Sequence, residues 1–255
     1  MRILIEAPQI AEKASGGLLK LANVIDTSGP LFHYGLEYEP APGGQSREVP
    51  TDGSDKVYED LLGQTVEGDP FGVYRGIDAA LLTHHGEPEA LVRELFAQGE
   101  SFAVEKVIQR EVFNAEGSVD LTPTPGTPVT NTRAALGLLE QYAGERYAGR
   151  PLLHTNRLGG SLLTDFAEGD GNGNLLTKLD TPVVIGSGYS ATGPSGAAAP
   201  AGAAWVYVTG QVNIWRSPVQ TYPAYDLKKN REIALAEAQY VPVVEAFTAA
   251  ILIGS

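Results

Sequence analysis

The chemistry-bearing side chains with the most regular spacing lie in the stretch Asp170-Gly-Asn-Gly-Asn174. Oxygen ligands at every second position are typical of a calcium-binding loop. An EF-hand also requires glycine at the sixth position and glutamate at the twelfth, where this chain has Leu175 and Thr181. The pattern therefore argues against an EF-hand. It favours a glycine-rich turn, with some other cation site as the alternative.

A nucleophile is the second kind of chemistry to test. Ser195 lies in Gly193-Pro-Ser-Gly-Ala197, which nearly matches the nucleophile elbow of hydrolases but lacks the closing glycine and a strand leading directly into it. The four histidines are His33, His84, His85 and His154. They lack metal-ligand spacing, and the sequence has no H-E-x-x-H, Walker A or G-x-G-x-x-G motif. We therefore assign no catalytic, cofactor or metal residue. A small soluble hydrolase using Ser195 or an Asp/His pair stays open as an alternative.

Composition narrows the class of protein further. The 255 residues include 31 acids and 18 bases, a net charge of −13. A protein that grips nucleic acid would carry a basic stripe, so this charge argues against that class, but not against a protein that encloses nucleic acid. Cysteine is absent, which excludes disulfides and thiolate metal sites. The N-terminal stretch lacks the apolar core of a signal peptide, and we expect the chain in the cytosol.

The element around which the others must be arranged is a predicted helix from Glu87 to Asn114. Pro88 in its first turn is a helix-start signal, and apolar side chains recur at spacings of three and four. The helix would be roughly 40 Å long, about twice the average length, with Gly99 costing about 1 kcal/mol relative to alanine. A helix this long needs a sheet or other helices along one side.

Residues 35–76 form the second informative region. They include a predicted strand at 36–39, a polar run rich in proline and glycine, and few apolar residues. Ordering such a segment costs on the order of 1 kcal/mol per residue in backbone entropy, which a lone two-stranded hairpin does not recover in water. If the segment is ordered, its compensating contacts must therefore come from outside its own chain. The alternative is a flexible linker.

The rest of the chain alternates predicted helices and strands. We predict a helix over 131–148, capped by Thr130 or Asn131, and strands over 176–185 and 205–215. Residues 231–239 have helical composition, whereas 241–253 form an apolar strand that closes the chain.

Taken together, this order of elements resembles the major capsid protein of tailed bacteriophages, a fold shared with encapsulin nanocompartments. The resemblance covers nearly the whole chain, including the runs Gln98–Lys106, Thr181–Tyr189 and Trp205–Trp215. It implies an α+β fold in which residues 231–239 form a strand. The implied parts are an N-terminal arm (1–34), an extended loop hairpin (35–76), a peripheral subdomain with the long spine helix (77–128 and 217–255) and an axial subdomain (129–216).

The resemblance also implies a function. The chain would be a non-enzymatic shell subunit that forms pentamers and hexamers of an icosahedral shell around double-stranded DNA, without sequence-specific binding. Because the spine helix begins near residue 87, we expect a separate scaffolding protein rather than a fused one, and a portal protein as a further partner. The expected location is the virion capsid, assembled in the bacterial host cytoplasm, with no membrane. An encapsulin-type shell, with a hydrophobic cargo groove near its N-terminal helix, is the closest alternative.

We expect contacts between subunits in the loop and on the spine helix. The residues we select are Tyr38, Arg47, Lys56, Tyr58, Arg93 and Glu105. Some relatives join a loop lysine to an asparagine across subunits; Lys56 and Asn230 could play those parts, but no motif specifies the pair.

Overall fold

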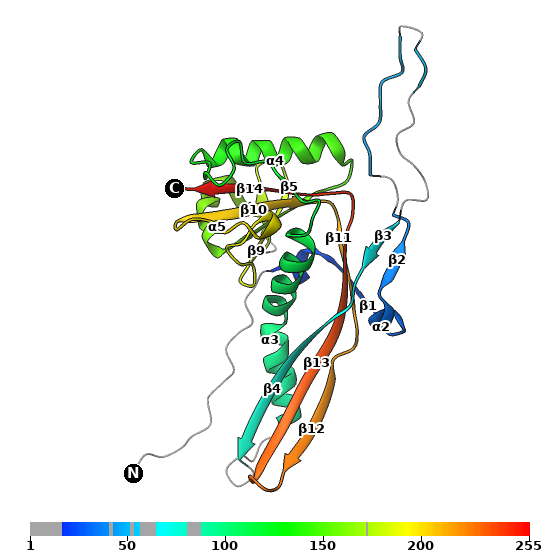
Figure 1. The fold of residues 1–255 in the computed structure, drawn as a ribbon, viewed down its shortest axis with the longest axis vertical. Coiled ribbons are helices and arrows are strands. Elements are labelled where there is room, and N and C mark those ends of the chain that lie inside the picture. The colour runs from blue at the N-terminus through cyan, green and yellow to red at the C-terminus, as the bar shows by residue number, and fades with distance from the viewer. Residues whose placement is uncertain (1–16, 41–42, 52–53, 57–64, 81–87, 172) are drawn as a thin grey trace.

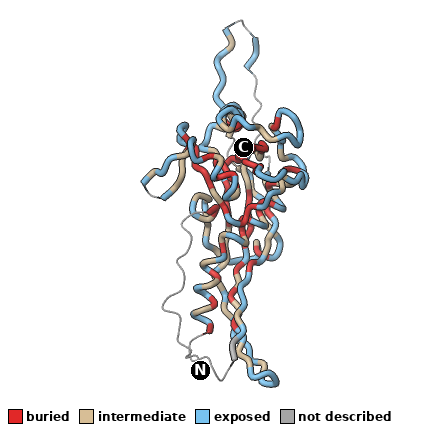
Figure 2. Tube along the Cα trace, turned by 90° about the vertical axis from the view of Figure 1, so that its left-hand side faces the viewer, coloured by how far each residue is buried: buried red, intermediate tan, exposed pale blue. Residues whose placement is uncertain are grey.

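The computed structural model describes residues 17–40, 43–51, 54–56, 65–80, 88–171 and 173–255, and the structural statements below concern these. The chain is elongated, with a five-stranded sheet and a long helix toward one end and a seven-stranded sheet with shorter helices toward the other (Figure 1). Buried residues run along the body of the molecule (Figure 2). None of the helices in the described ranges is long and apolar enough to cross a membrane.

The five-stranded sheet is organised around its longest strand, β13. Its strands are β1 (Asn23–Asp26), β4 (Phe71–Ala80), β11 (Val212–Arg216), β12 (Gln220–Asp226) and β13 (Arg231–Val244). The first half of β13 pairs antiparallel with β4 on one side and β12 on the other. Its second half pairs with β11, which pairs in parallel with β1 of the N-terminal arm.

The strand conformation of β13 confirms the expectation from the resemblance over the helical composition of residues 231–239. Ala234, Ala236 and Ala238 are buried, and they alternate with more accessible residues. Side chains of a strand alternate between faces, so these alanines share one face of the sheet. Small side chains there let α3 pack closely against the sheet, and burial outweighs the local helical preference.

The long helix is confirmed. It consists of α3 (Pro88–Ile108) followed by a π-helical turn, Gln109–Phe113. Val92, Phe96, Val104 and Ile108 are buried along the side that faces the sheet, as the spacing predicted.

The seven-stranded sheet is covered on both faces. Its order is β5 (Val119–Asp120), β14 (Thr248–Gly254), β10 (Ala203–Thr209), β6 (Leu152–Asn156), β9 (Pro182–Gly186), β8 (Leu175–Thr177) and β7 (Ala167–Gly169). Trp205 and Tyr207 of β10 join the core that includes α3, whereas Val206 and Val208 join the core that includes α4 (Thr132–Arg146). A second helix, α5 (Arg157–Leu162), and 3-10 turns at Thr164–Phe166 and Pro194–Gly196 complete this end.

Three predicted strands are wrong because each is two strands. Residues 176–185 turn back between β8 and β9, whereas 205–215 and 241–253 both change sheets part-way. At that crossing a Cβ on Gly210 would lie 2.2 Å from the carbonyl oxygen of Glu245, and Ala246 has a φ of 68°. The alternation of apolar residues continues in register across Gly210, so it did not reveal that break, whereas Lys178 and Asp180 interrupt the apolar pattern at the turn between β8 and β9.

The sheets therefore group the residues differently from the expected subdomain limits. β11, expected in the axial subdomain, belongs to the five-stranded sheet, and β14, expected in the peripheral subdomain, belongs to the seven-stranded sheet. Each pairs along its backbone with strands of the other group, and this pairing decides its position.

The arm contributes one strand to the five-stranded sheet and packs its first helix against α3 and β9, and the base of the loop lies beside β13. The described part of the arm contains α1 (Leu18–Leu21), β1 and α2 (Leu31–Tyr34). The loop begins and ends with the antiparallel pair β2 (Leu36–Tyr38) and β3 (Val66–Gly68). Residues 71–76, which the expected limits assign to the loop, belong to β4. Between β2 and β3, residues 46–51 project away from the body (Figure 1) and most of them are exposed.

Candidate subunit interface

Tyr38 fixes the base of the loop to its own subunit. Its hydroxyl donates to Glu245 Oε1 at 2.6 Å and accepts from Asn213 Nδ2 at 2.8 Å. Its ring lies 5.6 Å from that of Trp215, measured between centroids. Burial raises the pKa of Tyr38 well above its usual range, and the bond to Glu245 raises it further. Tyr38 therefore anchors the base of the loop within its own chain.

Beyond Tyr38, the described part of the loop contacts the end of α4, where the Ala148 backbone N–H donates to the Gly43 carbonyl oxygen at 2.7 Å. Gln45 Nε2 donates to the carbonyl oxygens of Gly144 and Tyr147 at the end of α4. Arg47 and Lys56 are exposed farther out, where a neighbouring molecule can reach them. Tyr58, also expected at the interface, lies outside the described residues.

Arg93 and Glu105, both on α3, differ in their exposure to solvent. Arg93 is exposed, with Nη2 3.3 Å from Thr221 Oγ1. Glu105 is only 1% exposed, so its expected contact with another subunit is wrong. A charged side chain on a long helix usually faces solvent, but Glu105 lies on the buried side of α3 with Val104 and Ile108.

Glu105 instead joins three separate segments of its own chain. Its Oε1 accepts from the Leu18 backbone N–H at 3.0 Å and the Ser101 hydroxyl at 2.8 Å, and its Oε2 accepts from the Gly188 backbone N–H at 2.9 Å. A Cβ on Gly17 would lie 2.5 Å from Oε1, so glycine leaves the space this carboxylate occupies. The contact connects the arm, α3 and the loop after β9.

A second polar network, missed from the sequence, joins the arm to α3 and β13. Arg216 binds Asp26 at 2.7 Å and Glu100 at 3.0 Å, and the Tyr240 hydroxyl donates to Glu100 at 2.8 Å. The bond to Arg216 lowers the pKa of Asp26, and the bond to Asp26 raises the pKa of Arg216. A signal was present, since Glu100 lies four residues after Phe96 on the buried side of the helix.

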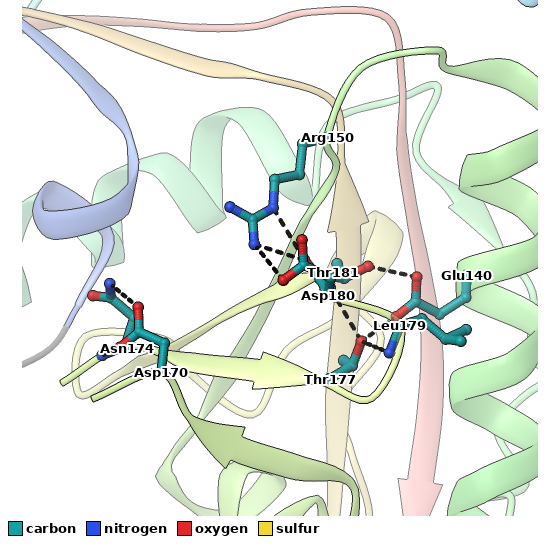
Figure 3. Close-up of polar contacts among 8 residues, drawn as sticks. All are labelled: Glu140, Arg150, Asp170, Asn174, Thr177, Leu179, Asp180 and Thr181. Carbon is teal, nitrogen blue, oxygen red and sulfur yellow. Dashed lines mark hydrogen bonds and ion pairs between the residues drawn. The ribbon is translucent and has the colours of Figure 1, made fainter. Parts of the chain in front are cut away.

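The turn between β8 and β9 is braced by its neighbours (Figure 3). Glu140 of α4 accepts from the hydroxyls of Thr177 at 2.8 Å and Thr181 at 2.6 Å. Arg150 donates twice to the backbone oxygen of Asp180, and its Nη2 lies 3.0 Å from the Asp180 carboxylate. These bonds fix a turn whose apex residue, Leu179, is 71% exposed.

The residues considered for catalysis or metal binding belong to turns or to hydrogen bonds of the fold itself. Asp170 accepts from both the backbone and side-chain nitrogens of Asn174, which closes a turn and confirms the favoured interpretation of this stretch (Figure 3). The described residues contain no cluster of three or more acids and histidines that could hold a metal. Ser195 is exposed in a 3-10 turn, whereas His154 is buried against the hydroxyls of Tyr189 and Thr209. Burial lowers the pKa of His154 to about 3, so this histidine is a poor general base for Ser195.

Comparison with known proteins identifies the fold of the chain. No family model matches the sequence, and no curated protein matches it. The capsid of a native GTA particle matches with a TM-score of 0.64 and 13% identity, over 100% of this chain and 95% of that chain. The capsid of Ralstonia phage GP4 matches with a TM-score of 0.60 and 9% identity, over the same shares. The chain has the phage capsid fold.

The capsid fold extends to further structures. A chain from Mycobacterium phage Adephagia matches with a TM-score of 0.55 and 11% identity, over 98% of this chain and 94% of that chain. These likenesses confirm the α+β fold class expected from the resemblance. In this capsid fold, the selected residues divide into internal anchors (Tyr38 and Glu105) and exposed positions (Arg47, Lys56 and Arg93).

Proposed function

We propose that the protein is the major capsid protein of a tailed bacteriophage or phage satellite, with a structural rather than enzymatic role. Copies of the chain form pentamers and hexamers, which build an icosahedral shell around double-stranded DNA. The observation that carries the proposal is the likeness to capsid structures over the full length of this chain and 95% of theirs.

The loop supports a role in assembly. Its base is fixed by Tyr38, and Gly43 and Gln45 are hydrogen-bonded to the end of α4, but residues 46–51 project from the body and are mostly exposed (Figure 2). Ordering such residues costs on the order of 1 kcal/mol each. Packing of this loop over an adjacent subunit would recover that cost, which explains why the subunit holds it outward.

The charge of the chain suits a container for DNA. With a net charge of −13, an inner wall would repel the nucleic acid it encloses and would not hinder packing or release. On this proposal the chain's partners are its own copies, a scaffolding protein and a portal protein. The shell would assemble in the cytoplasm of the bacterial host.

One observation favours the second candidate, an encapsulin-type shell with enzyme cargo. A cavity of about 460 Å³ lies between α1, α3 and β9, and its lining includes the apolar side chains of Leu21, Phe102 and Ile185. This is where a cargo groove near the N-terminal helix was expected. Particles purified from the producing cells separate the two candidates: nuclease-resistant DNA favours the phage capsid, whereas DNA-free particles that hold a protein cargo favour the encapsulin.

The assembly state of the purified chain tests the proposal directly. We expect megadalton particles in light scattering and closed shells in negative-stain images, with or without a co-expressed scaffolding protein. A matched variant in which residues 46–64 are replaced by a short Gly-Ser linker should fold but not form shells, because the loop contacts are removed. A wild-type chain that stays a 27.0 kDa monomer under all these conditions would contradict the proposal.

A further inference from the structure

Leu179 is an exposed apolar residue held in a fixed position. It is 71% exposed at the apex of the β8–β9 turn. Glu140 of α4 accepts hydrogen bonds from the threonines on both sides of this turn, and Arg150 donates to the backbone oxygen of Asp180 (Figure 3). Its own backbone N–H donates to Thr177 Oγ1 at 3.2 Å. A turn ordered in advance loses less entropy when it binds, so rigidity of this kind favours a contact surface.

The surroundings of Leu179 are apolar and carry positive charge. Beside the turn is a cavity of about 420 Å³, lined by Leu136, Phe166 and Leu179 among others. The Arg133 guanidinium lies 5.6 Å from the centroid of the Phe166 ring, and Lys178 is exposed. Of the nearby acids, Glu140 is hydrogen-bonded to the two threonines and Asp180 is bound by Arg150, whereas Asp165, next to Phe166, is exposed. We call Arg133, Phe166, Lys178 and Leu179 the Leu179 knob.

The opposite edge of the same sheet has the complementary character. β5 is the edge strand there, and its Val119 is 38% exposed. Glu116 and Asp120 flank this valine and are also exposed. We call Glu116, Val119 and Asp120 the β5 edge. It combines one apolar side chain with two acids, where the knob combines apolar side chains with two bases.

Sheet order gives these two surfaces a head-to-tail relation. β5 and β8 are separated by four strands, so at about 4.8 Å per strand they lie roughly 24 Å apart, too far for contact within one chain. β5 pairs with residues 249–250 at the start of β14, and Arg150, which holds the turn, lies two residues before the start of β6. Thr209 pairs with both Thr248 and Leu152, so the knob and the β5 edge lie toward the same end of the strands.

We propose that the Leu179 knob of one copy binds the β5 edge of the next copy. Two different, complementary patches on opposite sides of a subunit make a heterologous contact, which closes into a ring when the rotation permits. The apolar pair Leu179 and Val119 forms the centre of this contact, with Arg133 and Lys178 facing Glu116 and Asp120 around it. The inference rests on the proposed function and names a surface through which copies within one ring meet.

Disulfide trapping tests this contact, because the chain contains no cysteine. We would introduce Leu179→Cys and Val119→Cys together, assemble the protein, oxidise it and run it on a denaturing gel without reductant. A disulfide requires Cβ atoms about 3.8 Å apart, so it reports direct contact. We expect a ladder from dimer up to the size of the ring, with covalent dimers at most from either single variant.

A matched control pairs Leu179→Cys with Leu158→Cys on α5. Leu158 is 43% exposed, similar to Val119, but it lies just after the end of β6 that is far from Arg150. This pair should give no ladder. As a second measure, Lys178→Glu should slow assembly, and adding Asp120→Lys should restore it, because the exchange reverses the polarity of the proposed pair.

The outcomes separate this inference from the proposed function. Particles that form normally, with no ladder from the Leu179/Val119 pair or with an equal ladder from the Leu158 control, would overturn the contact and leave the capsid function standing. A wild-type chain that never associates would overturn both. Thermal melts of each variant before assembly identify any substitution that acts by unfolding the subunit.

Discussion

Substituting Glu105 by alanine should release the N-terminal arm and destabilise the subunit. The change leaves the backbone N–H groups of Leu18 and Gly188 without their acceptor in a buried position. Each buried, unpaired donor costs about 1–3 kcal/mol, which gives about 2–6 kcal/mol for the pair. The adjoining cavity of about 460 Å³ can admit water to these donors, so we expect the lower half of that range, about 2–4 kcal/mol.

Urea denaturation of subunits kept below the concentration for assembly measures this loss. Hydrogen exchange adds the location: the amides of Leu18 and Gly188 should exchange faster in Glu105→Ala by more than the change in global stability explains. The matched control is Glu94→Ala on the exposed side of α3, which should stay within about 0.5 kcal/mol of wild type. If Glu105→Ala also stays within that limit and both amides remain protected, the carboxylate does not join the three segments.

Three further predictions concern single residues. Burial lowers the pKa of His154 from 6.5 to about 3, so as the pH falls this histidine is protonated in the unfolded chain before it is protonated in the folded chain. The neutral, buried His154 makes its full contribution to stability above pH 6.5. Below that pH the free energy of unfolding falls by about 1.4 kcal/mol per pH unit, down to about pH 3, because His154 is protonated only in the unfolded chain. His154→Gln should therefore flatten the slope of unfolding free energy against pH in this range, and an unchanged slope would refute the prediction. Tyr38→Phe should cost about 1–2 kcal/mol in urea melts and speed proteolysis of the loop base, since Glu245 loses a donor; unchanged cleavage would count against the anchor. Gly210→Ala should cost more than about 2 kcal/mol, because its Cβ would overlap the Glu245 carbonyl oxygen, whereas Gly144→Ala in α4 meets no atom within 4 Å and should be neutral or stabilising in the same thermal melts.

Features that depend on local periodicity could be predicted from the sequence. The spacing of apolar residues gave α3, and the Asn131 cap gave the start of α4, where its side chain accepts from the Ala134 N–H. Strand breaks were missed where the apolar pattern continues while the chain changes sheets, as at Gly210. The sequence also could not show that Glu105 lies beside Leu18, 87 positions away. Only tertiary contacts distinguish a charged residue that binds inside the subunit from one that faces a neighbour.

The distribution of satisfied polar groups indicates which forces should drive assembly. Among the buried side-chain polar atoms of the described residues, Asn174 Oδ1 alone has no hydrogen-bond partner. The interior carboxylates, such as Glu100 and Glu105, are thus ion-paired or hydrogen-bonded before any neighbour arrives and have little more to gain from one. What a neighbour can still change is the exposure of apolar side chains, including Leu179 and Tyr222. Burial of such surface contributes about 25 cal/mol per Å², so the favourable free energy of assembly should come mainly from these residues, with surface charges setting orientation and rate.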